Sequence, residues 1–330
     1  MTLVELLVVV AILGLLSVVV LPNLSNPGDA RKTREAARAV AGFVANMQSR
    51  AIGSRGGAGL WLEPLANVIT DDKGIEHLVS IDLFAATIPE PYAGESLDAA
   101  VTVAPSTSVA NLTFVPASTF TPPDAINTAS NAFIRFTGSP SMFRLEPDGS
   151  GGWRAAMITG RNQTPYNTAW PVTAASGVPY EVLIDATKDP SASLTLGNAV
   201  AIDMTWAQLG SSQPWGLAAS GTIPLPIRAS QVLYDSAGRP RDVVRSAGLS
   251  EPMIEPVCLL VAPLEMIQKA TCFTTPGAYW VAIDPRGGAP RVAEVTTSGV
   301  SLDGKNRPAS SSDLIASQSL VRQSTFQEGR

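Results

Sequence analysis

The feature that most constrains the fold is a long apolar run at the start of the sequence. Seventeen of residues 1–21 are apolar. As a helix rising 1.5 Å per residue, Leu3 to Leu21 would measure about 28 Å, enough to cross the hydrocarbon core of a bilayer. A helix with one solvated face carries more polar residues than this. The run therefore predicts a single membrane-spanning helix over residues 1–25.

Two other interpretations of the run are a secretory signal peptide and a buried core helix. A signal peptide has a basic stretch before its apolar region and a small-residue cleavage site after it. The sequence has neither feature around residues 1–21. For a core helix with one solvated face, 17 apolar residues of 21 are too many.

Glu5 is the one charged residue in the run. A carboxylate at the centre of a bilayer costs about 2.5–3.5 kcal/mol on insertion scales, so it needs a partner or a role. Because Glu5 lies near the end of the run, an interfacial carboxylate with no role is the alternative.

The first 25 residues, which include Pro22, resemble the mature N-terminus of type IV pilins and type II secretion pseudopilins. The resemblance implies cleavage by a prepilin peptidase and N-methylation of residue 1. That residue is Met1 here, where Phe is commonest. It also implies a helix kink at Pro22. The Glu5 carboxylate would neutralise the α-ammonium of Met1 on a neighbouring subunit, a strong pairing in the low dielectric of a filament core.

An amphipathic helix is predicted after the apolar run, within a region spanning residues 26–55. Asn26 is a suitable N-cap, and Pro27 suits the first helical position. Apolar residues then recur every three or four positions to residue 52, and a Gly-rich stretch at 53–57 ends the pattern. This helix, followed by a strand at 59–63, is similar to the FimT/GspH-type minor pseudopilins.

Residues 56–330 are predicted to form a β-rich domain. Alternating apolar patterns that predict strands occur at residues 78–84, 133–136, 142–146, 153–158 and 180–184. Residues 97–131 are rich in Ser, Thr, Pro and Ala and predict an exposed excursion. Two turns of similar sequence, at 232–241 and 281–291, each contain Asp, Gly and a final Pro-Arg, and are interpreted as scaffold hairpins.

The resemblance and these patterns together imply an α+β fold of the pilin kind. A long N-terminal transmembrane and amphipathic helix would pack on a large antiparallel β-sheet body. The chain would be a single-pass protein of the bacterial inner membrane with a periplasmic or extracellular C-terminal domain. Its partners would be other pilins or pseudopilins, the prepilin peptidase/methyltransferase and the inner-membrane assembly platform. Its function would be that of a structural filament subunit in a type II secretion pseudopilus or a type IV pilus.

The chain lacks the residues that most enzymes and metalloproteins require. It contains one His, His77, and two Cys, which excludes most zinc sites and most His-dependent catalysis. No phosphate-binding Gly loop, dinucleotide fingerprint or Gly-x-Ser-x-Gly sequence occurs. We therefore expect no catalytic residues, no cofactor and no metal, and interpret His77 as a residue at a strand edge.

Arg239 and Arg241 are the candidate phosphate contacts. They lie in a basic turn whose Gly-Arg-x-Arg pattern is similar to one used by minor pilins that take up DNA. A minor pilin that binds DNA or a surface ligand is therefore the alternative function. Residues 56–330 carry 17 Lys and Arg against 25 Asp and Glu. That net charge of −8 repels a polyanion and argues against nucleic acid as a partner.

Cys258 and Cys272 are separated by 13 residues. In an exported domain they could form a disulfide, worth about 3 kcal/mol in the chain-entropy model. Two unpaired, buried cysteines are the alternative.

Overall fold

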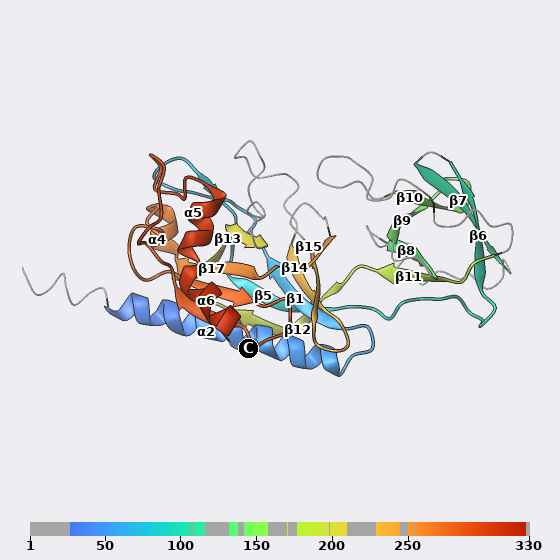
Figure 1. The fold of residues 1–330 in the computed structure, drawn as a ribbon, viewed down its shortest axis with the longest axis horizontal. Coiled ribbons are helices and arrows are strands. Elements are labelled where there is room, and N and C mark those ends of the chain that lie inside the picture. Colours follow the sequence, from blue (N-terminus) through green and yellow to red (C-terminus); the bar gives the residue numbers. More distant parts are fainter. Residues whose placement is uncertain are drawn as a thin grey trace, which may run out of the picture. The chain divides into compact units, whose positions relative to one another are not determined.

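The structure is a computed structural model, and it describes residues 27–106, 108–115, 132–137, 142–157, 170, 177–197, 199–209, 229–244, 250–253 and 255–327. These residues form two compact units (Figure 1). Unit 2 comprises residues 54–57 and 87–187, and unit 1 comprises the rest of the described chain. Most of unit 2 is thus inserted between two strands of unit 1, β5 (Asp82–Thr87) and β12 (Thr187–Thr195), which are neighbours in one sheet.

Unit 1 contains two large sheets and a two-stranded ribbon. The first sheet has the order β12-β5-β1-β14-β15-β16, and the second has the order β19-β18-β17-β13-β4. The remaining strands of these sheets are β1 (Ala58–Glu63), β4 (Val79–Ser80), β13 (Val200–Leu209), β14 (Ser230–Tyr234), β15 (Pro240–Val244), β16 (Ser250–Pro252), β17 (Val257–Pro263), β18 (Tyr279–Ile283) and β19 (Arg291–Glu294). The ribbon pairs β2 (Ile69–Thr70) with β3 (Glu76–His77).

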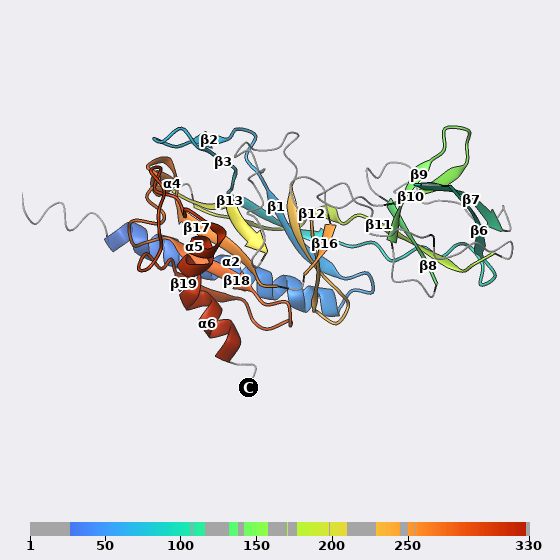
Figure 2. The ribbon, with the colours of Figure 1, turned by 45° about the horizontal axis from the view of Figure 1, so that its top comes forward.

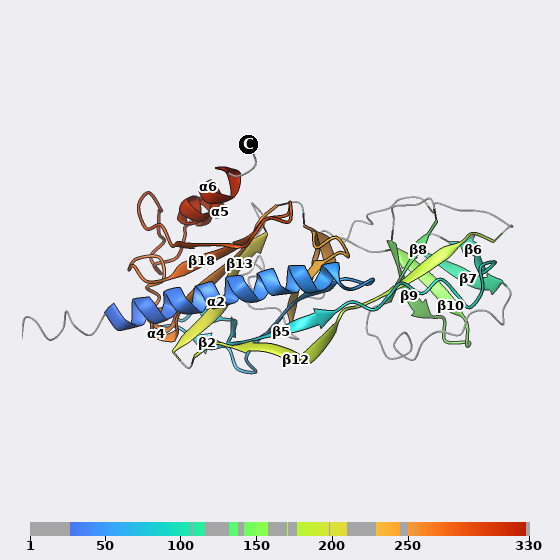
Figure 3. The ribbon, with the colours of Figure 1, turned by 90° about the horizontal axis from the view of Figure 1, so that it is seen from below.

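The helix α2 (Pro27–Ile52) lies along one side of these two sheets (Figure 3). Its buried residues are Thr33, Ala37, Val40, Val44, Met47, Gln48 and Ala51. They recur every three or four positions, so they form one stripe, which packs against strands of both sheets. The opposite stripe, which includes Arg31 and Arg38, is exposed. The bounds of α2 match the helix expected from residue periodicity.

The other face of the second sheet is covered by short helices (Figure 2). These are α4 (Leu264–Gln268), α5 (Ser311–Ser317) and α6 (Ser319–Gln327). Residues of β17 and β18 alternate between two hydrophobic clusters, so that Leu259 faces α2 whereas Leu260 and Trp280 join Ile267, Leu314 and Val321 of the short helices. Both faces of this sheet are therefore shielded from solvent, and every residue of β18 is buried.

Unit 2 is built from one antiparallel sheet with the order β11-β8-β9-β10-β7-β6. Its strands are β6 (Ala100–Pro105), β7 (Val109–Val115), β8 (Ala132–Phe136), β9 (Met142–Pro147), β10 (Trp153–Met157) and β11 (Tyr180–Ile184). The sheet curls until Val101 of β6 exchanges two backbone hydrogen bonds of 2.9 Å with Val178, just before β11. The inward residues form one cluster, centred on Ile134, Phe136 and Phe143.

The predicted fold class is wrong. The chain is mostly β, with 44% strand and 18% helix, and the expected single large β body over residues 56–330 is two units with separate sheets and cores. The predicted exposed excursion at 97–131 contains β6 and β7, and its residues 116–131 lie outside the described ones. Val101, Val103, Ala110 and Leu112 point inward there, while the Thr and Asn residues between them point outward. That alternation outweighs the polar composition.

The structure also corrects the predicted single-pass, transmembrane topology and the inner-membrane localisation that follows from it. Among the residues that the structure describes, no helix is both long and apolar enough to cross a bilayer. The helix α2 has the length, but charged residues recur through its first half. The apolar residues 1–25 lie outside the described part of the chain.

Candidate functional site

The cluster with the most distinctive chemistry is built around His77, at the end of β3. Its Nδ1 lies 2.7 Å from Oδ2 of Asp203, which is in β13 of the second sheet. Its Nε2 lies 3.2 Å from Oδ2 of Asp71, in the turn that joins β2 to β3. One imidazole thus connects the ribbon to the sheet through two carboxylates.

Local hydrogen bonds fix both carboxylates. The second oxygen of Asp71, Oδ1, accepts the backbone N–H groups of Lys73 and Ile75 at 2.9 and 2.7 Å, which closes the turn. Oδ1 of Asp203 accepts the backbone N–H of Thr205 at 3.0 Å. Each carboxylate therefore has one oxygen committed to the backbone and the other to His77.

All three side chains are withdrawn from water, with exposed fractions of 5% for His77, 1% for Asp71 and 0% for Asp203. Burial alone would lower the pKa of His77, but the charge and hydrogen bond of Asp203, followed by those of Asp71, outweigh it and raise the pKa to about 9. At neutral pH His77 is therefore an imidazolium that donates both N–H groups. The cluster is a buried ion triad with one positive and two negative charges.

This geometry favours a structural role over acid–base catalysis. A general base needs a ring nitrogen with a free lone pair, and both nitrogens of His77 face carboxylates. The nearest thiol does not supply a nucleophile either. Burial, followed by the charges of Asp203 and Asp71, raises the pKa of Cys272 well above its usual value. The triad instead fastens the β2–β3 ribbon to β13.

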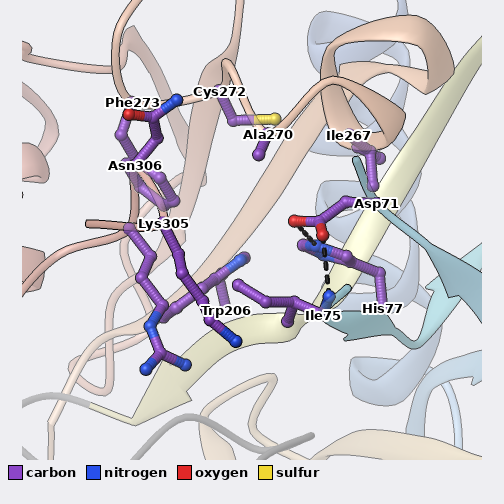
Figure 4. Close-up of a pocket in the computed structure, with 11 residues that line it drawn as sticks. Asp71, Ile75, His77, Trp206, Ile267, Ala270, Cys272, Phe273, Lys305 and Asn306 are labelled. Atoms are coloured by element: carbon purple, nitrogen blue, oxygen red, sulfur yellow. Dashed lines mark hydrogen bonds and ion pairs between the residues drawn. The ribbon is translucent and has the colours of Figure 1, made fainter. Parts of the chain in front are cut away.

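Asp71 and His77 of the triad lie in the wall of a small pocket (Figure 4). The pocket is lined by Asp71, Ile75, His77, Trp206, Ile267, Ala270, Cys272, Phe273, Lys305, Asn306 and Arg307. Trp206 and Phe273 meet edge to face, with ring centroids 5.5 Å apart. Within the described residues, no group of three or more His, Cys, Asp or Glu could hold a metal ion.

The two cysteines are both free thiols in the structure, and both are buried in the cluster between the second sheet and the short helices. The structure therefore does not contain the disulfide that the sequence leaves possible. Burial raises the pKa of Cys258 to about 12, although Arg322 acts in the opposite direction. Neither thiol is a reactive thiolate at neutral pH.

Arg239 and Arg241 lie on both sides of Pro240, where the turn between β14 and β15 ends. Both side chains are exposed. The turn is closed by Asp235, whose Oδ1 accepts the backbone N–H groups of Ala237 and Arg239 at 2.9 and 2.8 Å. Arg241 donates to Asp242 at 2.6 Å. The two arginines therefore differ, since only Arg241 has an ion-pair partner among the described residues.

The remaining predicted site residues, Met1, Glu5 and Pro22, lie outside the described residues. Sequence reasoning missed the partners of His77. Asp203 interrupts the otherwise apolar run Val200–Met204, and a lone carboxylate in a buried strand needs a cationic partner. With a single His in the chain, that signal was available.

Comparisons with family models, with curated proteins and with solved structures find no match for this chain.

Proposed function

We propose that this chain is a structural subunit of a filament of the type IV pilus or type II secretion pseudopilus kind. The observation that carries the proposal is the helix α2, which begins six positions after the apolar residues 1–21 end. A helix that buries one stripe against its own sheets keeps the other stripe for contacts with neighbouring copies. An apolar segment ahead of it then supplies the surface that such copies bury together.

The exposed stripe of α2 suits close packing between subunits. Its middle part carries Ala39, Gly42 and Ala45, which are small and exposed. A Cβ at Gly42 would meet no atom within 4 Å. Among the described residues, no contact therefore requires glycine there, although glycine in a helix interior costs about 1 kcal/mol relative to alanine. A neighbouring backbone that approaches this position would account for it.

Within the filament, Glu5 sets the register between subunits. Its carboxylate neutralises the α-ammonium of Met1 on the adjacent copy, and the apolar surroundings make a mismatched register costly because they leave a charge unpaired. The partners are other pilin-like subunits and a prepilin peptidase that exposes and methylates residue 1. The role is structural and needs no cofactor.

DNA or surface-ligand binding through Arg239 and Arg241 receives less support. Arg241 is paired with Asp242, and the chain has a net charge of −5. Of the two arginines, only Arg239 would be free to bind a phosphate, and the net negative charge of the chain would repel the polyanion.

The test replaces Glu5 by Gln and by Leu in the full-length chain and counts filaments by electron microscopy. We expect both variants to fold but to form filaments at least about tenfold less, because a buried α-ammonium without its carboxylate costs several kcal/mol. The control is Glu76→Gln. Glu76 is exposed on β3, outside α2 and its packing stripe, and its loss should leave assembly unchanged. Filaments of Glu5→Leu at the wild-type level would refute the proposal.

A further inference from the structure

Ile52 and Leu97 are two of the most exposed large apolar residues in the described chain. Ile52, at the end of α2 in unit 1, is 64% exposed, and Leu97 in unit 2 is fully exposed. Single exposed apolar residues are common. These two differ from the ordinary case in their charged neighbours. Arginines lie on the surface around Ile52, whereas carboxylates flank Leu97.

Three chain segments form the surface around Ile52. Gly238 packs so closely that a Cβ there would lie 2.9 Å from Cγ1 of Ile52, and a Cβ at Gly287 would lie 3.7 Å from Cα of Arg239. The side chain of Gln48 donates to the carbonyl of Gly288 at 3.3 Å. The two similar turns of the sequence thus lie side by side at the end of α2. We call Ile52, Arg239 and Arg286 the Ile52 patch.

The arginines of the Ile52 patch are exposed, while the nearby carboxylates serve the backbone. Asp235 is half-buried and accepts two backbone N–H groups of its turn. Asp284 likewise accepts the backbone N–H of Arg286 at 2.9 Å. Arg239 and Arg286 have no ion-pair partner in the part of the chain that the structure describes. The patch therefore presents an aliphatic centre between two available guanidinium groups.

Leu97 lies at the tip of a tight turn in which the N–H of Ala99 donates to the carbonyl of Ser96 at 3.1 Å. Glu95 and Asp98 flank it, and both are exposed. Asp98 has no partner among the described residues, and Glu95 accepts only the hydroxyl of Tyr92, at 3.1 Å. Between Lys73 and Arg135 the sequence contains no Lys or Arg. We call residues 95–98 the Leu97 turn.

We propose that the Leu97 turn of one copy docks on the Ile52 patch of a second copy, with Leu97 against Ile52 and the two carboxylates facing Arg239 and Arg286. The charges are complementary, and the apolar centres exclude water from the charge pairs around them. The two surfaces are different, so the contact is heterologous and can repeat from copy to copy without closing. The inference rests on the proposed filament function and names one of its lateral contacts.

The first experiment mixes two single-cysteine variants of the full-length chain, Ile52→Cys and Leu97→Cys, that carry tags of different size. Mild oxidation should produce a cross-linked heterodimer, because only neighbouring copies bring the two thiols together. The native cysteines are buried and stay reduced. The control pair is Lys73→Cys with Leu97→Cys, since Lys73 is exposed but lies outside the Ile52 patch. Cross-linking no stronger than in the control pair would overturn the proposal.

The second experiment reverses charge. Arg239→Glu with Arg286→Glu should weaken association by about tenfold, and Glu95→Arg with Asp98→Arg in the partner should restore it. Lys73→Glu, on the exposed turn between β2 and β3, should have no effect. Filaments that persist unchanged in the reversed variants would overturn this contact and leave the filament function standing. Specific cross-linking of Ile52→Cys with Leu97→Cys in a chain that forms no filaments would support the contact and count against the function.

Discussion

In unit 1 the central strands are buried on both faces, whereas in unit 2 each strand buries one face only. Every residue of β14 and β18 is buried, and in the sheet of β18, α2 covers one side and the short helices cover the other. In unit 2, β11 alternates buried and half-buried residues, and β7 alternates buried ones with residues that are exposed or half-exposed. A strand that is covered on both faces thus has a continuous run of buried residues, whereas a strand that is covered on one face alternates buried and more exposed residues.

The two units also differ in their buried charges, although both carry ion pairs at the surface. Unit 1 encloses the His77 triad in its interior. Unit 2 carries Arg135–Glu181 and Arg154–Glu146 between neighbouring strands on its outer surface, with side chains 29–44% exposed. Charges removed from water are costly to leave unpaired, and charges at the surface are screened. Electrostatic changes should therefore affect unit 1 far more than unit 2.

The largest effect is expected from Asp203→Ala. It leaves the His77 imidazolium with Asp71 alone and should destabilise unit 1 by about 3–5 kcal/mol, the usual cost of breaking a buried ion pair. Hydrogen exchange followed by mass spectrometry separates the units, because β13 and β17 peptides report on unit 1 and β8 and β9 peptides on unit 2. Faster exchange is expected in unit 1 alone. Unchanged protection of β13 would contradict the structural role of the triad.

Alkaline pH should weaken unit 1 selectively. The folded pKa of His77, about 9, lies above the unfolded value of 6.5. Its contribution to stability is therefore complete below pH 6.5 and is lost as the pH rises through 9, by about 3 kcal/mol in total. The groups around it do not oppose this trend, because the pKa of Cys272 is raised well above its usual value.

The measurement is urea unfolding from pH 6 to pH 10, followed by exchange in both units. His77→Gln is the matched variant, because it keeps a polar side chain and removes the imidazole titration. Its stability should stay level up to about pH 8.5, where that of the wild type already declines. Above that pH the raised pKa values of Cys258 and Cys272 lower the stability of both proteins alike. In unit 2, burial raises the pKa of Tyr180 to about 12, beyond the range tested. An equal loss of stability in both units would contradict the assignment.

The sequence predicts local elements well and the division of the chain poorly. Periodicity predicts α2 with its bounds, and the alternating strands of unit 2 at 133–136, 142–146 and 180–184 coincide with β8, β9 and β11. No local sequence pattern predicts the insertion of unit 2 between β5 and β12, because these strands pair with each other although they lie about a hundred residues apart in the sequence. The strands β6 and β7 were not predicted, because their Ala- and Thr-rich composition resembles that of an exposed loop.

The sequence indicates the triad only in part, because Asp203 is a carboxylate in an apolar strand and needs a cationic partner, but the geometry of the triad depends on the fold. Asp203 lies 126 residues from its partner His77, and only the fold brings them to 2.7 Å. The apolar run at residues 1–21 supports the filament hypothesis, but it lies outside the described residues, so the structure gives no contacts for it. Its filament interpretation stays a prediction, because Met1 and Glu5 lie outside the described residues.

The smallest effect is expected from Arg135→Ala on the outer surface of unit 2. Arg135 and Glu181 lie opposite each other on β8 and β11, about two-fifths exposed. A surface pair of this kind contributes about 0.2–1 kcal/mol and is screened by salt. The variant should lose that amount in dilute buffer and nothing at 1 M NaCl, as measured by exchange of β8 and β11 peptides. Asp203→Ala should remain destabilised at the same salt concentration, since ions do not reach a 0% exposed carboxylate. A loss of stability above about 2 kcal/mol for Arg135→Ala that does not depend on salt would contradict the comparison. The surface ion pair of unit 2 would then behave like the buried ion cluster of unit 1.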